Sequence, residues 1–97
     1  MKELTDRVVA TAERLEDTDD PHAIDYLEYS FDVQPDATVN EVTLMVTTGG
    51  PQIEVNCLSG TVTGYWGGDR HTTHVESDAV KELGYYLAER FEEEYRR

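Results

Sequence analysis

The sequence has a single cysteine, Cys57, and no apolar run long enough for a membrane-spanning helix. One thiol cannot close an intramolecular disulfide, and a four-cysteine zinc site is excluded. A spanning helix needs about 18 consecutive apolar residues, and residues 1–7 lack the apolar stretch of a signal peptide. These absences predict one soluble, cytoplasmic domain over residues 1–97, without a membrane partner.

Basic residues are also scarce: 8 lysines and arginines face 21 acidic residues, for a net charge of −13. No basic patch is visible, which argues against direct binding to nucleic acid. With few lysines and isoleucines and much valine and threonine, the composition resembles that of cytoplasmic proteins from extreme halophiles. The simplest interpretation is adaptation to molar salt, where the Debye length falls to about 3 Å and repulsion is screened. The alternative is an acidic mimic of nucleic acid that occupies a partner's basic groove.

Apolar residues recur every three or four positions in three segments, which predicts helices over about 2–16, 21–30 and 78–95. Asp20-Pro21 is a helix-start signal, since aspartate is a good N-cap and proline suits the first helical position. Ser77 is the expected N-cap of the last helix. The residues at helical spacing are Leu4, Val8, Ala12 and Leu15, then Ile24, Leu27 and Phe31, then Val80, Leu83, Leu87 and Phe91.

The middle of the chain instead alternates apolar and polar residues, which predicts strands. Three strands are expected over 39–48, 52–57 and 61–66, and a short fourth over 71–75 at the sheet edge. Short glycine-containing turns between them favour an antiparallel meander. These turns are Gly49-Gly50-Pro51, Ser59-Gly60 and Gly67-Gly68-Asp69.

The expected fold is a two-layer α+β domain in the order α-α-β-β-β-(β)-α. One sheet face is apolar and covered by helices, and Gly84 on the last helix permits a close approach to it. The other face carries Thr43, Met45 and Tyr65, and an antiparallel sheet can leave such a face wet or offer it to a partner. The residues expected on the covered face are Val42, Leu44, Val46, Ile53, Val55, Val62 and Trp66.

Two short segments resemble those of small uncharacterised haloarchaeal proteins. These are the TTGGP-x-I hairpin of residues 47–53 and the GYWGG turn of residues 64–68. The resemblance covers roughly residues 41–75 and implies a small α+β domain. It brings no activity, cofactor or site residue with it.

The turn after the third strand concentrates unusual side chains and is the candidate surface for a ligand or partner. Trp66 is expected to fill the core, while Tyr65 points to the open face. Arg70 either clamps an anion or pairs with a carboxylate nearby. The candidate residues are Tyr65, Trp66, Asp69, Arg70, His71 and His74.

Two histidines three positions apart point to opposite faces of a strand. His71 then shares a face with Asp69 and Thr73, and His74 with Thr72, so no metal site is predicted. Cys57 is expected to be a buried, unreactive thiol, because a nucleophile needs a base that is not close in sequence. Convergence of Cys57 with either histidine in space stays open.

We therefore expect no catalytic residues and no cofactor, and the leading hypothesis is a non-enzymatic protein-interaction or regulatory module. Tyr85 and Tyr86, with Tyr26 and Tyr29 on the second helix, suggest a homodimer. The first alternative is a ligand- or metal-binding domain that uses Arg70, His71 and His74. The second is the acidic mimic.

Overall fold

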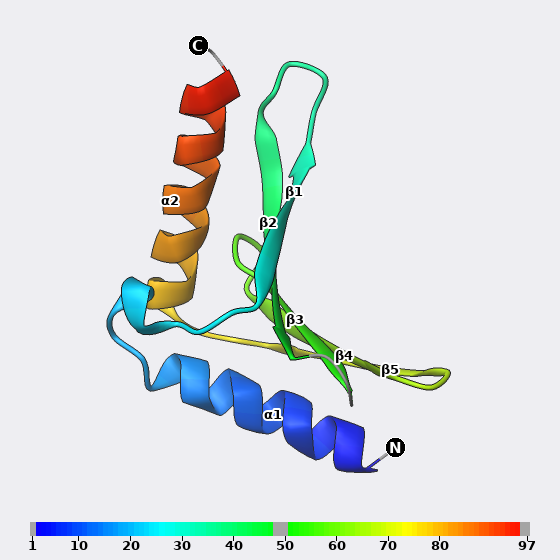
Figure 1. Cartoon of the computed structure of the whole chain (residues 1–97). Helices are drawn as coiled ribbons and strands as arrows, with labels where there is room; N and C mark the ends of the chain where they lie inside the picture. Colours follow the sequence, from blue (N-terminus) through cyan, green and yellow to red (C-terminus); the bar gives the residue numbers. More distant parts are fainter. Residues whose placement is uncertain (1, 48–50, 96–97) are drawn as a thin grey trace.

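The fold is α+β: two helices lie on one face of a five-stranded antiparallel sheet (Figure 1). The computed structural model describes residues 2–47 and 51–95. The elements are α1 (Lys2–Glu16), the short 3-10 helix η1 (Pro21–Ala23), β1 (Glu28–Val33), β2 (Val39–Thr47), β3 (Gln52–Asn56), β4 (Thr61–Trp66), β5 (Asp69–His74) and α2 (Asp78–Tyr95).

The sheet is a meander with the spatial order β1-β2-β3-β4-β5, so β1 and β5 are its edges. The two helices divide its covered face between them: α1 packs on β4 and β5, and α2 packs on β2. Figure 1 shows α2 standing alongside β1 and β2, while α1 lies across the other end. In the part of the chain described here, no helix combines the length and apolar character needed to cross a bilayer.

Most of the predicted elements are confirmed. The first and last helices have the expected bounds, and the Oγ of Ser77 accepts a hydrogen bond from the Val80 N–H at 3.2 Å. β2, β3 and β4 match the predicted strands to within a residue, and β5 begins two residues before the expected position. The predicted turn at Gly49-Gly50 lies outside the described residues.

The predicted second helix is wrong: residues 21–30 form one turn of 3-10 helix and the start of β1. The start signal itself works, because the Asp20 side chain accepts the His22 N–H and Pro21 opens the turn. Beyond it, aromatic and β-branched residues favour a strand. Tyr29 and Phe31 pair with Leu44 and Val42 of β2, and this pairing gives the meander a fifth strand.

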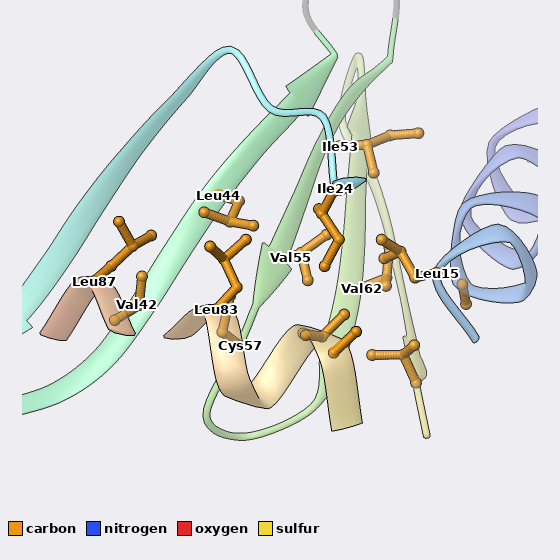
Figure 2. Packing of buried hydrophobic residues seen from close by; sticks show 14 of the residues in the cluster. Leu15, Ile24, Val42, Leu44, Ile53, Val55, Cys57, Val62, Leu83 and Leu87 are labelled. Carbon is orange, nitrogen blue, oxygen red and sulfur yellow. The ribbon is translucent and has the colours of Figure 1, made fainter. Parts of the chain in front are cut away.

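The core lies between the sheet and the helices, and Figure 2 shows Leu44, Val55 and Val62 of the strands converging there with Leu83 of α2. Val46 is partly buried and packs against the edge of this core. The fully buried side chains of largest volume are Leu4, Leu44, Val8, Val42, Val55, Val62, Val80 and Cys57.

The prediction that Trp66 fills the core is wrong, since its side chain is 40% exposed. Alternation does put it on the same side of β4 as Val62 and Gly64. However, Leu4 and Val8 of α1 lie against Gly64, where a Cβ would sit 2.9 Å and 2.5 Å from them. Trp66 is two residues closer to the hairpin tip, beyond the part of the strand that the start of α1 covers.

Candidate functional site

The structure divides the sequence-predicted site residues between the two faces of the β4–β5 hairpin. Tyr65 pairs with Arg70, and His74 pairs with Thr61, all on the open face. Trp66 pairs with Asp69 on the opposite face, where His71 also lies, opposite Gly64. Five of the six are exposed and His71 is half-buried. Tyr65, Trp66, Asp69 and Arg70 lie at the hairpin tip, whereas His71 and His74 lie further along β5.

The two histidines point to opposite faces, as their spacing predicts. Within residues 2–47 and 51–95, no three His, Cys, Asp or Glu side chains are grouped closely enough to hold a metal ion. Arg70 is not in an ion pair with any described carboxylate; the pair that forms is Arg7 with Glu3, at 3.4 Å.

Cys57 is fully buried, as predicted. Burial away from water raises the pKa of its thiol from 9.0 to about 12, and the charge of Glu41 adds to the shift. Neither histidine is among the groups that act on it. The thiol is held in its neutral form, in which it is a poor nucleophile, and it serves as a packing residue under α2.

A cavity of about 340 Å³ lies between the end of α1, the segment after η1 and the end of β2. Its volume reaches the lower end of the range for small-ligand sites. The walls are mixed, slightly more apolar than polar, with one cation from Arg14 and one carboxylate from Asp25. Its lining residues are Arg14, Leu15, Thr18, Ala23, Ile24, Asp25, Tyr26, Leu27, Val46 and Thr47. Sequence reasoning missed it because it joins segments far apart in the chain.

A second hollow runs between β1 and α2, and we call it the aromatic cleft. It is lined by Tyr29, Phe31, Leu87, Arg90, Phe91 and Glu94, and its volume is about 60 Å³. The rings of Phe31 and Phe91 are 4.8 Å apart between centroids, which joins the strand to the helix. Tyr29 and Tyr95 continue the row on either side, with centroid distances of 5.5 Å and 6.3 Å, and both remain largely exposed.

Arg90 lies at the wall of the aromatic cleft. Its guanidinium carbon is 5.7 Å from the centre of the Tyr86 ring, and it donates a hydrogen bond to the Tyr86 hydroxyl at 3.4 Å. This hydrogen bond raises the pKa of Arg90 above its ordinary value. Tyr86 also meets the ring of His22 edge-on at 5.4 Å. Tyr86 therefore links the guanidinium of Arg90 to the ring of His22.

On the open face beside β1 lies a third hollow, which we call the acidic cleft. It is lined by Glu28, Tyr29, Ser30, Thr43, Met45 and Glu54 and has a volume of about 110 Å³. The carboxylates of Glu28 and Glu54 stand on either side of Met45, since Met45 pairs with both residues across the sheet. The two clefts therefore flank one edge strand, one on each face of the sheet.

Comparison with known proteins adds no relative: the chain matches no family model, no curated protein and no solved structure. Function therefore has to be argued from the geometry alone. The sequence carried a signal for the aromatic cleft in the alternation of Tyr29, Phe31 and Val33, which a helical interpretation of residues 21–30 conceals.

Proposed function

We propose that the protein is a non-enzymatic protein-interaction module that binds its partner through β1 and the aromatic cleft. The observation that carries this proposal is the position of β1: it is an edge strand with exposed aromatic side chains next to it. Aromatic residues are enriched in protein interfaces, and Tyr and Arg often dominate the binding energy. Tyr29, Arg90 and Tyr95 together supply this chemistry.

The test is affinity capture from a lysate of the host cell with the tagged full chain. Tyr29→Ser combined with Tyr95→Ser removes one exposed ring that lines the aromatic cleft and one that continues its row of rings beyond Phe91. The matched control, Tyr65→Ser combined with Trp66→Ser, removes two exposed rings from the hairpin tip. We expect the same specific partner to be lost from the first variant and retained by the second, with both variants folded by circular dichroism.

Two other results overturn the proposal. Loss of the partner only from the hairpin variant moves the binding surface to Tyr65 and Trp66. Retention of the partner by both variants shows that neither pair of aromatic side chains is needed for binding. If the partner is a second copy of this chain, size-exclusion chromatography with light scattering will detect a dimer. This measurement is made at about 2–3 M KCl, where the Debye length nears 3 Å.

A small-ligand function is the second candidate, and the 340 Å³ cavity favours it. An amphipathic carboxylate suits the cavity, because Arg14 supplies a charge partner and Leu15, Ile24 and Val46 an apolar wall. Thermal shifts measured with a series of short aliphatic carboxylates test this function. The small-ligand function is supported if Arg14→Met loses the thermal shift and Arg7→Met, elsewhere on α1, retains it. If the unaltered chain shows no thermal shift, this function is refuted.

The acidic composition supports a salt-rich cytoplasm as the place where this module works. The remaining alternative, a mimic of nucleic acid, predicts competition with DNA for a basic partner at the salt concentration of the cell. A mimic needs broad charge rather than an aromatic cleft, so Tyr29→Ser with Tyr95→Ser leaves such competition intact.

A further inference from the structure

We infer that the partner segment is an extended peptide with alternating basic and apolar residues, which adds as a sixth strand along β1. This inference rests on the proposed function and names the class of partner. It follows from the orientation of the backbone of β1 and from the different chemistry of the two clefts that flank it.

The backbone of β1 has hydrogen-bonding groups that face away from the sheet. The carbonyl of Met45 accepts the Leu27 N–H, whereas the carbonyl of Val42 accepts the N–H of Cys57, the residue directly after β3. Met45 therefore faces β1 and Val42 faces β3. Since the direction alternates along a strand, the backbone groups of Tyr29, opposite Leu44, point to the free side.

Phe31 pairs with Val42 and therefore presents its N–H and C=O to the free side as well. No strand in the described part of the chain pairs with this side of β1. Unpaired edge groups are a template for another strand, and peptide recognition by strand addition obtains affinity from them. The free edge thus offers two residues with both a donor and an acceptor to an incoming peptide.

The acidic cleft selects basic side chains on the open face. Glu28 on β1 lies next to an added strand and provides the near carboxylate, whereas Glu54 on β3 is three strand spacings away, about 14 Å, and adds only to the negative charge of this face. Asp32 lies two residues beyond Ser30 and projects to the same face of β1. A strand laid along β1 therefore meets carboxylates on this face at positions where its own side chains recur every second residue.

The aromatic cleft offers the rings of Phe31 and Phe91 to apolar side chains on the other face, next to the charged groups of Arg90 and Glu94. Its volume of about 60 Å³ accepts part of one aliphatic side chain, whereas a small-molecule site is usually about 300 Å³ or larger. Successive residues of a strand point to opposite faces. One peptide strand can therefore place basic residues in the acidic cleft and apolar residues against Phe31 and Phe91.

One register of pairing with a second copy of β1 is unfavourable. A twofold antiparallel pairing centred on Ser30 places Glu28 of each copy opposite Asp32 of the other. Like charges directly opposite each other destabilise a strand pair, and edge charges commonly prevent self-pairing. The same two carboxylates attract a basic strand, so the charge pattern favours a foreign peptide.

The peptide test uses fluorescence anisotropy with the full chain at about 0.15 M KCl, where the Debye length is about 8 Å. The probe is a capped peptide of alternating lysine and leucine, matched in length to the six residues of β1. One control replaces each lysine by glutamate, and another carries N-methyl groups on the alternate amides that would face β1. We expect each control to bind at least about tenfold more weakly, the equivalent of roughly one net hydrogen bond.

Variants of the protein test the same two features from the other side. Tyr29→Pro and Tyr29→Val both lose the ring, but only the proline variant also loses the outward N–H, so we expect it to bind the probe about tenfold more weakly than the valine variant. Glu28→Gln with Asp32→Asn should weaken binding by a similar factor. Glu13→Gln with Glu82→Gln, the matched removal of two exposed carboxylates, should change it little.

The possible results distinguish a failure of strand addition from a failure of the proposed function. Equal binding of the N-methylated or the acidic probe overturns strand addition or basic selectivity, and so does equal binding by the proline and valine variants. If cellular capture still depends on Tyr29 and Tyr95, the interaction function survives with a different partner class. If capture ignores both residues, the proposed function fails instead, whatever the probe does.

Discussion

Gly84 of α2 lies directly against Cys57 of the segment after β3: a Cβ at Gly84 would be 2.6 Å from the Cβ of Cys57. It would also be 3.0 Å from the Cδ2 of Leu58. Figure 2 shows Cys57 beneath α2, near Leu83. The helix reaches the sheet this closely only because position 84 has no side chain, as the sequence led us to expect.

Gly84→Ala therefore tests how closely the two layers pack. Alanine favours a helix by about 1 kcal/mol over glycine, but the Cβ of Cys57 is fixed to the backbone and cannot move aside. Overpacking of this kind costs about 1–3 kcal/mol, so we expect a net loss of stability in urea denaturation. Gly68→Ala is the control, since a Cβ there meets nothing within 4 Å. A Gly84→Ala protein as stable as the unaltered chain would contradict the close packing.

Glu41 holds the turn after β3 with its carboxylate. Its Oε1 accepts the Leu58 N–H at 2.7 Å and the Val42 N–H at 2.9 Å, and its Oε2 accepts the Ser59 N–H at 3.0 Å. Hydrogen bonds to charged groups contribute about 1.5–3 kcal/mol. We expect Glu41→Ala to lower the free energy of unfolding by that amount and Glu41→Gln by less. Glu13→Ala, on the exposed side of α1, should lower it little; equal losses would deny Glu41 this role.

Cys57 should resist alkylation in the native protein. Its folded pKa of about 12 lies above the ordinary 9.0, so the unfolded chain releases the thiol proton at lower pH. This contribution to stability is complete below pH 9 and is lost as pH rises from 9 to about 12. At neutral pH, iodoacetamide labelling followed by mass spectrometry should proceed only at the rate of unfolding. Native labelling as fast as in urea would refute the burial of this thiol.

Salt should stabilise the fold strongly. With −13 charges on 97 residues, carboxylates repel one another across the domain when the Debye length is about 30 Å at 0.01 M salt. The melting temperature, followed by circular dichroism, should rise steeply from low to molar KCl. A flat curve would remove the halophilic interpretation and make the acidic charge a feature of function.

Local pattern was sufficient for the elements with one consistent period. The last helix has an N-cap at Ser77 and an apolar stripe of Val80, Leu83 and Leu87, and both point to the same structure. Residues 24–31 satisfied two patterns at once, since Ile24, Leu27 and Phe31 have helical spacing while Tyr29 and Phe31 alternate. The choice was made by pairing with β2, a contact more than ten residues away that no local pattern records.

The candidate site was harder to predict for the same reason. Alternation correctly placed Tyr65 and Met45 on the open face and separated His71 from His74. The aromatic cleft, however, joins β1 to residues of α2 some sixty positions later. While β1 was interpreted as a helix, the sheet's free edge could not be inferred. The prediction for Trp66 was wrong because the position of α1 on the sheet decides which residues of β4 it covers. No local sequence pattern records that position.

The position of α1 has a consequence for the order of folding. This helix buries its face against β4 and β5, and its end is tied to the segment before α2: the Glu76 N–H donates to Glu16 and the Ser77 hydroxyl to the carbonyl of Leu15. During synthesis α1 emerges before β4 and β5, so its apolar side stays exposed until those strands form. Contacts so distant in sequence slow folding. We therefore expect this helix to dock only after β4 and β5 have formed.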